Sequence, residues 1–152
     1  MDQNIHQNRP VRISVTQQPQ HQPYAQQPVP EAPNVRVLAV LSHLSSLLGL
    51  VISVGTLSFL GPLIFWFVYR DRPEYAFVRA CSAGAFNFNL MVWLVNIAAG
   101  ILALVTLGIG LIAAVPIWGV TSLAAIIFHI IGAVQAHRGE VFRYPLQIRV
   151  LR

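Results

Sequence analysis

The sequence predicts an all-α fold, a polytopic transmembrane helical bundle preceded by a disordered N-terminal tail. Two long stretches, residues 37–69 and 80–137, contain no Asp, Glu, Lys or Arg. Only 10% of all residues are charged, against about a quarter in a typical soluble domain. The mean hydropathy of the chain is +0.61. Apolar stretches this long and this free of charge belong in lipid, so a soluble globular domain is excluded.

The N-terminal segment, residues 1–35, is rich in Gln and Pro and has too little apolar surface to form a core. It also lacks the apolar run of a secretory signal. We therefore expect three parts: a disordered Pro/Gln-rich tail at 1–35, a transmembrane helical domain at 36–139, and a basic juxtamembrane tail at 140–152. The last of these either lies extended along the membrane surface or is free.

The first apolar block, residues 37–69, would be ~50 Å long as one helix, whereas the hydrocarbon core of a membrane is ~30 Å thick. The pair Gly61-Pro62 is a natural break. We expect a helix to about Leu57, a turn near Gly61 and a short returning helix at 62–69. A single tilted span over the whole block is the alternative.

The charged island at residues 70–79 separates the two apolar blocks. Asp71 followed by Glu74, with Pro73 between them, is typical of a capping box, which would start a helix near Arg72. The charged residues of the island and those that flank the apolar blocks are expected to lie at the membrane interface and to set the topology. They are Arg36, Arg70, Asp71, Arg72, Glu74, Arg79, Arg138 and Arg143.

The second apolar block, residues 80–137, is long enough for two spans. Gly108 and Gly110 predict a turn between a span at about 87–107 and another at 111–136. Gly139 follows the basic residues that end the second span, as expected of a helix C-cap.

Five polar residues lie within the apolar blocks, and we take them as candidates for the bundle interior: His43, Asn87, Asn89, Asn96 and His129. Asn89 and Asn96 are seven residues apart and share a helix face, whereas Asn87 is offset from them. Structural hydrogen bonds between helices are the preferred interpretation over a substrate site. The sequence indicates no catalytic, cofactor or metal site, and the single Cys81 predicts neither a disulfide nor zinc.

Charge predicts the topology. The net charge of +5 comes mostly from Arg at the edges of the apolar blocks, where lipid headgroups lie, so we expect the lipid bilayer and no nucleic acid as a partner. If every basic cluster obeys the positive-inside rule, each block enters and leaves on the same side. This predicts two hairpins in a cytoplasmic (inner) membrane, with both termini in the cytoplasm.

Several segments resemble the Tic-twenty-like family of small bacterial membrane proteins, a domain of unknown function. They are residues 41–45, 61–66, 85–89 and 135–146. The resemblance covers about residues 36–151. It implies a helical bundle distantly related to a channel or scaffold component of the chloroplast inner-envelope protein translocon, and hence a link to protein transport.

The leading functional hypothesis is a non-enzymatic membrane protein that acts in a membrane complex, with membrane-protein partners or further copies of itself. The alternative is a small transporter or channel, in which Asn87, Asn89, Asn96 and His129 line a path. A third hypothesis is a haem protein that uses His43 and His129, the only histidines well within the apolar blocks.

Overall fold

A computed structural model describes residues 33–152 and shows four α-helices in this part of the chain. Helix α1 covers Pro33–Ile52, α2 covers Leu60–Tyr69, α3 covers Ala76–Val105 and α4 covers Leu111–Arg138. The predicted all-helical bundle with a short second segment is confirmed. The predicted disordered tail falls largely on residues 1–32, which lie outside the described part.

Three stretches are long and apolar enough to cross a membrane: Asn34–Ile52, Pro73–Val105 and Leu111–Arg138. Large apolar side chains are exposed along all of them, for example Leu48 at 61% and Leu104 at 77%. Outward-facing apolar side chains on a helical bundle contact lipid. The exposed apolar surfaces and the three long apolar helices are those of a multi-pass membrane protein.

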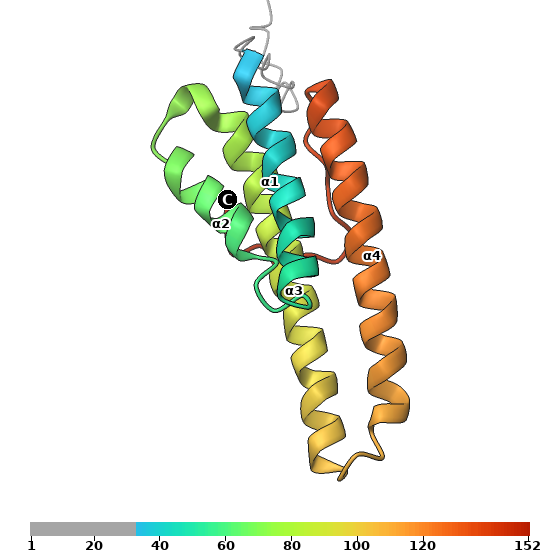
Figure 1. Ribbon diagram of the computed structural model, residues 1–152. Coiled ribbons are helices and arrows are strands. Elements are labelled where there is room, and N and C mark those ends of the chain that lie inside the picture. The colour runs from blue at the N-terminus through green and yellow to red at the C-terminus, as the bar shows by residue number, and fades with distance from the viewer. Residues whose placement is uncertain (1–32) are drawn as a thin grey trace, which may run out of the picture.

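The helices form two antiparallel hairpins, α1–α2 and α3–α4 (Figure 1). The start of α1, the start of α3 and the end of α4 lie at the same end of the bundle (Figure 1). Arg36 and Gly139 are neighbours there, since a Cβ on Gly139 would lie 3.4 Å from Arg36 Nε. The Arg-bearing ends of both hairpins therefore lie on one side.

The first hairpin turns earlier than the sequence suggests. Helix α1 ends at Ile52 rather than near Leu57, and the turn occupies residues 53–59, where Gly55 has a φ of +86°. Gly61 is not in the turn, because it belongs to the first turn of α2. A Cβ on Gly61 would overlap Ser45 Oγ, so this glycine permits close packing of α2 on α1.

The two hairpins differ in length. The carbonyl oxygen of Ser58, in the α1–α2 turn, lies 3.1 Å from Asn89 Nδ2, and Phe59 packs edge-on against Phe86 and Trp93. These partners are in the middle of α3. At about 1.5 Å per residue, the end of α3 lies about 24 Å beyond Asn89. The first hairpin is therefore much shallower than the second.

The charged island does not start a helix in the predicted way. Pro73–Tyr75 forms a short 3₁₀ helix whose N-cap is Arg72, and no side chain caps it. Asp71 instead pairs with its neighbour Arg70 at 2.9 Å. The predicted capping box is wrong because the carboxylate of Asp71 is engaged outside the helix. The other two helix-end predictions hold: Gly108 (φ +94°) lies in the α3–α4 turn, and Gly139 (φ +85°) caps α4.

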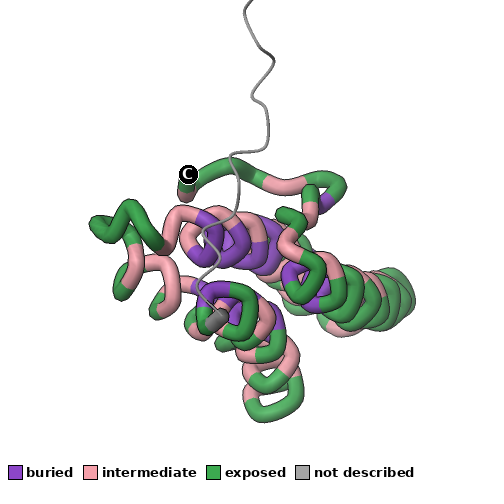
Figure 2. Tube along the Cα trace, turned by 90° about the horizontal axis from the view of Figure 1, so that it is seen from above, coloured by how far each residue is buried: buried purple, intermediate pink, exposed green. Residues whose placement is uncertain are grey.

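The buried surface lies where α1, α3 and α4 face one another, and the outer faces are exposed (Figure 2). One cluster joins α1, α3 and α4 and contains Val35, Ala39, Val78, Cys81 and Ala136. A second joins α3, α4 and the C-terminal segment through Ala85, Phe88, Ala125 and Tyr144. The C-terminal segment, residues 140–152, is extended and lies against the bundle, so it is part of the fold.

Candidate functional site

A buried set of hydrogen-bonded side chains joins three helices and the C-terminal segment. Tyr144 Oη lies 2.9 Å from His43 Nδ1 and 2.9 Å from His129 Nδ1. His129 Nε2 lies 2.9 Å from Asn89 Oδ1, and Asn89 Nδ2 donates to Ser46 Oγ at 3.0 Å. We call these five residues the polar network. All are almost completely buried, with at most 4% of each residue exposed.

Small residues make room for the polar network. A Cβ on Gly132 of α4 would lie 3.0 Å from the His43 ring and 3.1 Å from Tyr144 Oη. Gly132 therefore lets α4 approach α1 closely enough for the two imidazoles to share one phenol. Such close approach at small residues is the usual way in which helices pack in membranes.

The hydrogen-bond partners assign the direction of each bond. The carbonyl oxygen of Ser58 only accepts, so the Asn89 amide must turn Nδ2 toward it and Oδ1 toward His129. Because Oδ1 also only accepts, His129 donates from Nε2, and its Nδ1, in the neutral ring, accepts the Tyr144 hydroxyl proton. Tyr144 Oη then accepts from His43 Nδ1.

This assignment leaves one atom without a partner. His43 Nε2 carries no proton, and no atom of the described residues donates a hydrogen bond to its lone pair. No carboxylate of residues 33–152 bonds to either imidazole, and a buried imidazolium without a counter-ion would be costly. Burial, and to a smaller extent the Cys81 thiol, raise the pKa of Tyr144 well above its ordinary value, so the phenol keeps the proton that it donates.

The other two candidate amides have separate roles. Asn87 bonds only to the C-terminal segment: its Oδ1 accepts from the N–H groups of Val150 and Leu151, both at 2.9 Å. Asn96 Oδ1 accepts from Thr121 Oγ1 of α4 at 2.7 Å. The structure therefore brings His43, Asn89 and His129 together but places Asn87 and Asn96 elsewhere, so the four residues of the proposed transport path do not line a common route.

The geometry does not fit a haem held between His43 and His129. The two ring centroids are 6.2 Å apart, and both Nδ1 atoms are engaged by Tyr144. His129 Nε2 is engaged by Asn89. Only His43 Nε2 keeps a lone pair for a ligand, whereas two axial nitrogens would be required. Among residues 33–152, no group of three or more His, Cys, Asp or Glu is arranged to hold a metal ion.

The charged candidates lie outside the polar network. Arg79 Nη1 donates to the carbonyl oxygen of Arg70 at 2.7 Å, which ties the start of α3 to the end of α2. The guanidinium of Arg72 lies 6.0 Å from the ring centre of Tyr69. Arg36 adjoins the end of α4, and Glu74, Arg138 and Arg143 are exposed. These residues form no site with the buried imidazoles.

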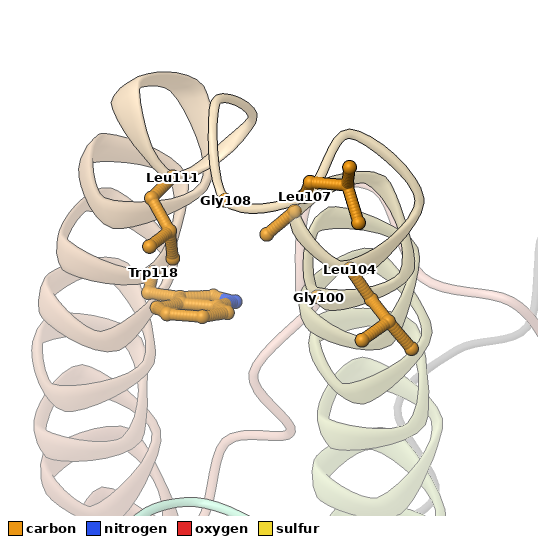
Figure 3. Close-up of a pocket in the computed structure, with 7 residues that line it drawn as sticks. Gly100, Leu104, Leu107, Gly108, Leu111 and Trp118 are labelled. Atoms are coloured by element: carbon orange, nitrogen blue, oxygen red, sulfur yellow. The ribbon is translucent and has the colours of Figure 1, made fainter.

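A pocket of about 430 Å³ lies near the α3–α4 turn, away from the polar network (Figure 3). Its lining is apolar and includes Leu104, Leu107, Leu111 and Trp118. Trp118 turns its Nε1 to the backbone oxygen of Asn96 at 3.0 Å, so the indole offers the pocket only its apolar ring. The pocket suits a hydrocarbon chain and has no group for chemistry.

Sequence reasoning missed Tyr144 and Ser46. The C-terminal segment was expected to lie on the membrane surface or to be free, and nothing in its sequence marks Tyr144 as an interior residue. The only local signal was a single hydroxyl-bearing aromatic residue in an otherwise basic segment.

Comparison with known proteins assigns the family. Residues 34–151 match the model of MamF/MmsF, described as the magnetosome magnetite crystal formation protein family. The resemblance to the Tic-twenty-like family is therefore wrong, and the link to protein transport that it implied is withdrawn. No curated protein and no solved structure matches the chain.

Proposed function

The chain belongs to the magnetosome magnetite crystal formation protein family, and we propose that it acts in magnetite crystal formation as a non-enzymatic structural component of the magnetosome membrane. The observation that carries the proposal is the extent of the match, which covers all four helices and the C-terminal segment. The role that the family is named for is therefore proposed for the whole bundle.

The polar network supports a structural role. Each of its members is buried, and four of the five are fully engaged with other parts of the protein. The network ties α1, α3, α4 and the C-terminal segment together at one level. A binding or catalytic site for iron species would instead present several unpaired ligand atoms on an accessible surface.

We propose that the Arg-bearing end faces the cytoplasm and the α3–α4 turn faces the magnetosome interior. The positive-inside rule supports this orientation, because Arg36, Arg79 and Arg138 lie at the end opposite that turn. The partners are further membrane proteins or further copies of this chain, held through the exposed apolar faces.

Deletion of the chain in its native host, followed by electron microscopy of the crystals, tests the role. We expect smaller or fewer magnetite crystals, restored when the wild-type chain is supplied. Crystals of unchanged size and number would contradict the proposal. Crosslinking in native membranes tests the assembly, and recovery of the uncrosslinked chain alone would contradict it.

The non-enzymatic part has its own test. Variants of the polar network, such as His129→Asn, should impair crystals only in proportion to the amount of protein that remains in the membrane, measured by immunoblot. A variant present at the wild-type amount that fails to restore crystals would show that the imidazole has a chemical role.

A further inference from the structure

The C-terminal segment is fixed to the side of the bundle at two points. Asn87 of α3 accepts from the N–H groups of Val150 and Leu151 and donates through Nδ2 to the carbonyl oxygen of Leu151, each at 2.9 Å. Tyr144 is held in the polar network by both imidazoles. The path of this extended segment relative to the helices is therefore set by side chains deep in the bundle.

Much of this segment's backbone has no hydrogen-bond partner among residues 33–152. Among residues 141–152, the backbone–backbone hydrogen bond that the structure shows is from Val150 N to the Ile148 carbonyl oxygen. Irregular backbone that faces lipid does not occur within the hydrocarbon region, because its N–H and C=O groups must be hydrated. The segment therefore lies at headgroup level, where water is present.

Three arginines project from this segment: Arg143, Arg149 and Arg152, all exposed. Among residues 33–152, the ion pair that the structure contains joins Arg70 and Asp71 at the far end of α2, so no carboxylate of this part neutralises the three. Guanidinium groups bind phosphate with paired, charge-assisted hydrogen bonds. We propose that these arginines bind the phosphates of anionic phospholipids and so fix the depth of the protein in the membrane.

The length of α3 agrees with this depth. From Asn87, where the segment is attached, to Thr106 at the α3–α4 turn is about 29 Å at 1.5 Å per residue. The hydrocarbon core is ~30 Å thick. The exposed apolar turn residue Leu107 then lies at the opposite interface. Ser46 of α1 bonds to Asn89, and α1 continues six residues further to Ile52, about 9 Å. The α1–α2 turn therefore dips below the level of Asn89 into the near leaflet and does not cross.

The test uses the full chain reconstituted in phosphatidylcholine vesicles with spin-labelled phosphatidylglycerol or spin-labelled phosphatidylcholine. Electron paramagnetic resonance then measures which lipid is held at the protein surface. Near a membrane surface each arginine is worth about fivefold in affinity for anionic lipid. We expect a preference for phosphatidylglycerol that falls by at least about fivefold in Arg143→Gln/Arg149→Gln/Arg152→Gln. An unchanged preference would overturn the proposal.

A second pair of variants separates position from charge. Asn87→Leu keeps every arginine but removes the attachment of the segment, and it should also reduce the preference. The matched control is Asn96→Leu, which removes a different amide of α3 and should preserve the preference. Equal preferences in the two variants would show that the position of the segment is irrelevant.

Depth is measured on proteins that keep all arginines, so it does not depend on those variants. Single-tryptophan chains are made by Trp→Phe at the other two positions. Trp66, whose Nε1 bonds to the Arg152 carbonyl oxygen at 3.3 Å, should be quenched best by lipids brominated near the headgroup. Trp93 and Trp118 should be quenched best by lipids brominated deep in the acyl chain. Strongest quenching of Trp66 by the deep bromines would overturn the proposed depth.

Discussion

Tyr144 donates its hydroxyl proton to His129 Nδ1 at 2.9 Å, which joins the C-terminal segment to the C-terminal half of α4. The same phenol oxygen accepts from His43 of α1. One residue outside the helices thus satisfies two buried imidazoles that have no other partner at Nδ1 among residues 33–152. The C-terminal segment is consequently a part of the helical core, and its removal should affect the whole bundle.

Tyr144→Phe should lower the free energy of unfolding by about 1–3 kcal/mol, because it leaves two buried Nδ1 atoms unpaired. Phe keeps the stacking on Phe88, whose ring centroid is 4.8 Å away. Unfolding in mixed micelles, followed by circular dichroism, measures the change. Tyr75→Phe is the control, since the Tyr75 hydroxyl makes no hydrogen bond within residues 33–152. Equal effects of the two substitutions would contradict the assigned role.

Asn89→Leu should destabilise the folded protein more than Asn96→Leu does. Asn89 makes three hydrogen bonds, to His129, Ser46 and the Ser58 carbonyl oxygen, and its loss leaves buried groups unpaired at a cost of about 1–3 kcal/mol. Asn96 loses its bond from Thr121, and hydrogen bonds between membrane helices average about 0.6 kcal/mol. Thermal unfolding in detergent compares the two, and a reversed order would be inconsistent with the polar network.

Gly132→Ala tests the close approach of α4 to α1. The new methyl group would lie 3.0 Å from the His43 ring, and overpacking of this kind costs about 1–3 kcal/mol. Gly119→Ala is matched to it on the same helix: no atom lies within 4 Å of the new methyl group, so it should be neutral or stabilising by up to about 1 kcal/mol. Equal stability of the two variants would show that α4 is not packed on His43.

Local pattern was sufficient to predict the helical class and the α3–α4 turn. The apolar blocks and Gly108 determine the structure of their own segments, so these predictions do not depend on contacts with the rest of the chain.

Features that depend on distant partners could not be predicted in this way. Gly61 was interpreted as a turn residue, but its smallness serves contact with Ser45 on the preceding helix. Tyr144 acquires its role from His43, which is 101 residues earlier. The depth of the first hairpin likewise depends on where Ser58 meets Asn89, which no local pattern encodes.

The central claim is that both hairpins start from the same side of the membrane and that only the second reaches the other side. Single cysteines at Thr56, Ile109 and Glu140, in a Cys81→Ala chain, are labelled with a membrane-impermeant thiol reagent added to one side or the other. All three positions are on exposed residues. We expect Glu140→Cys and Ile109→Cys to react from opposite sides, and Thr56→Cys to react only after detergent is added. Labelling of Thr56→Cys from the same side as Ile109→Cys would contradict the account, because α1 would then cross the membrane.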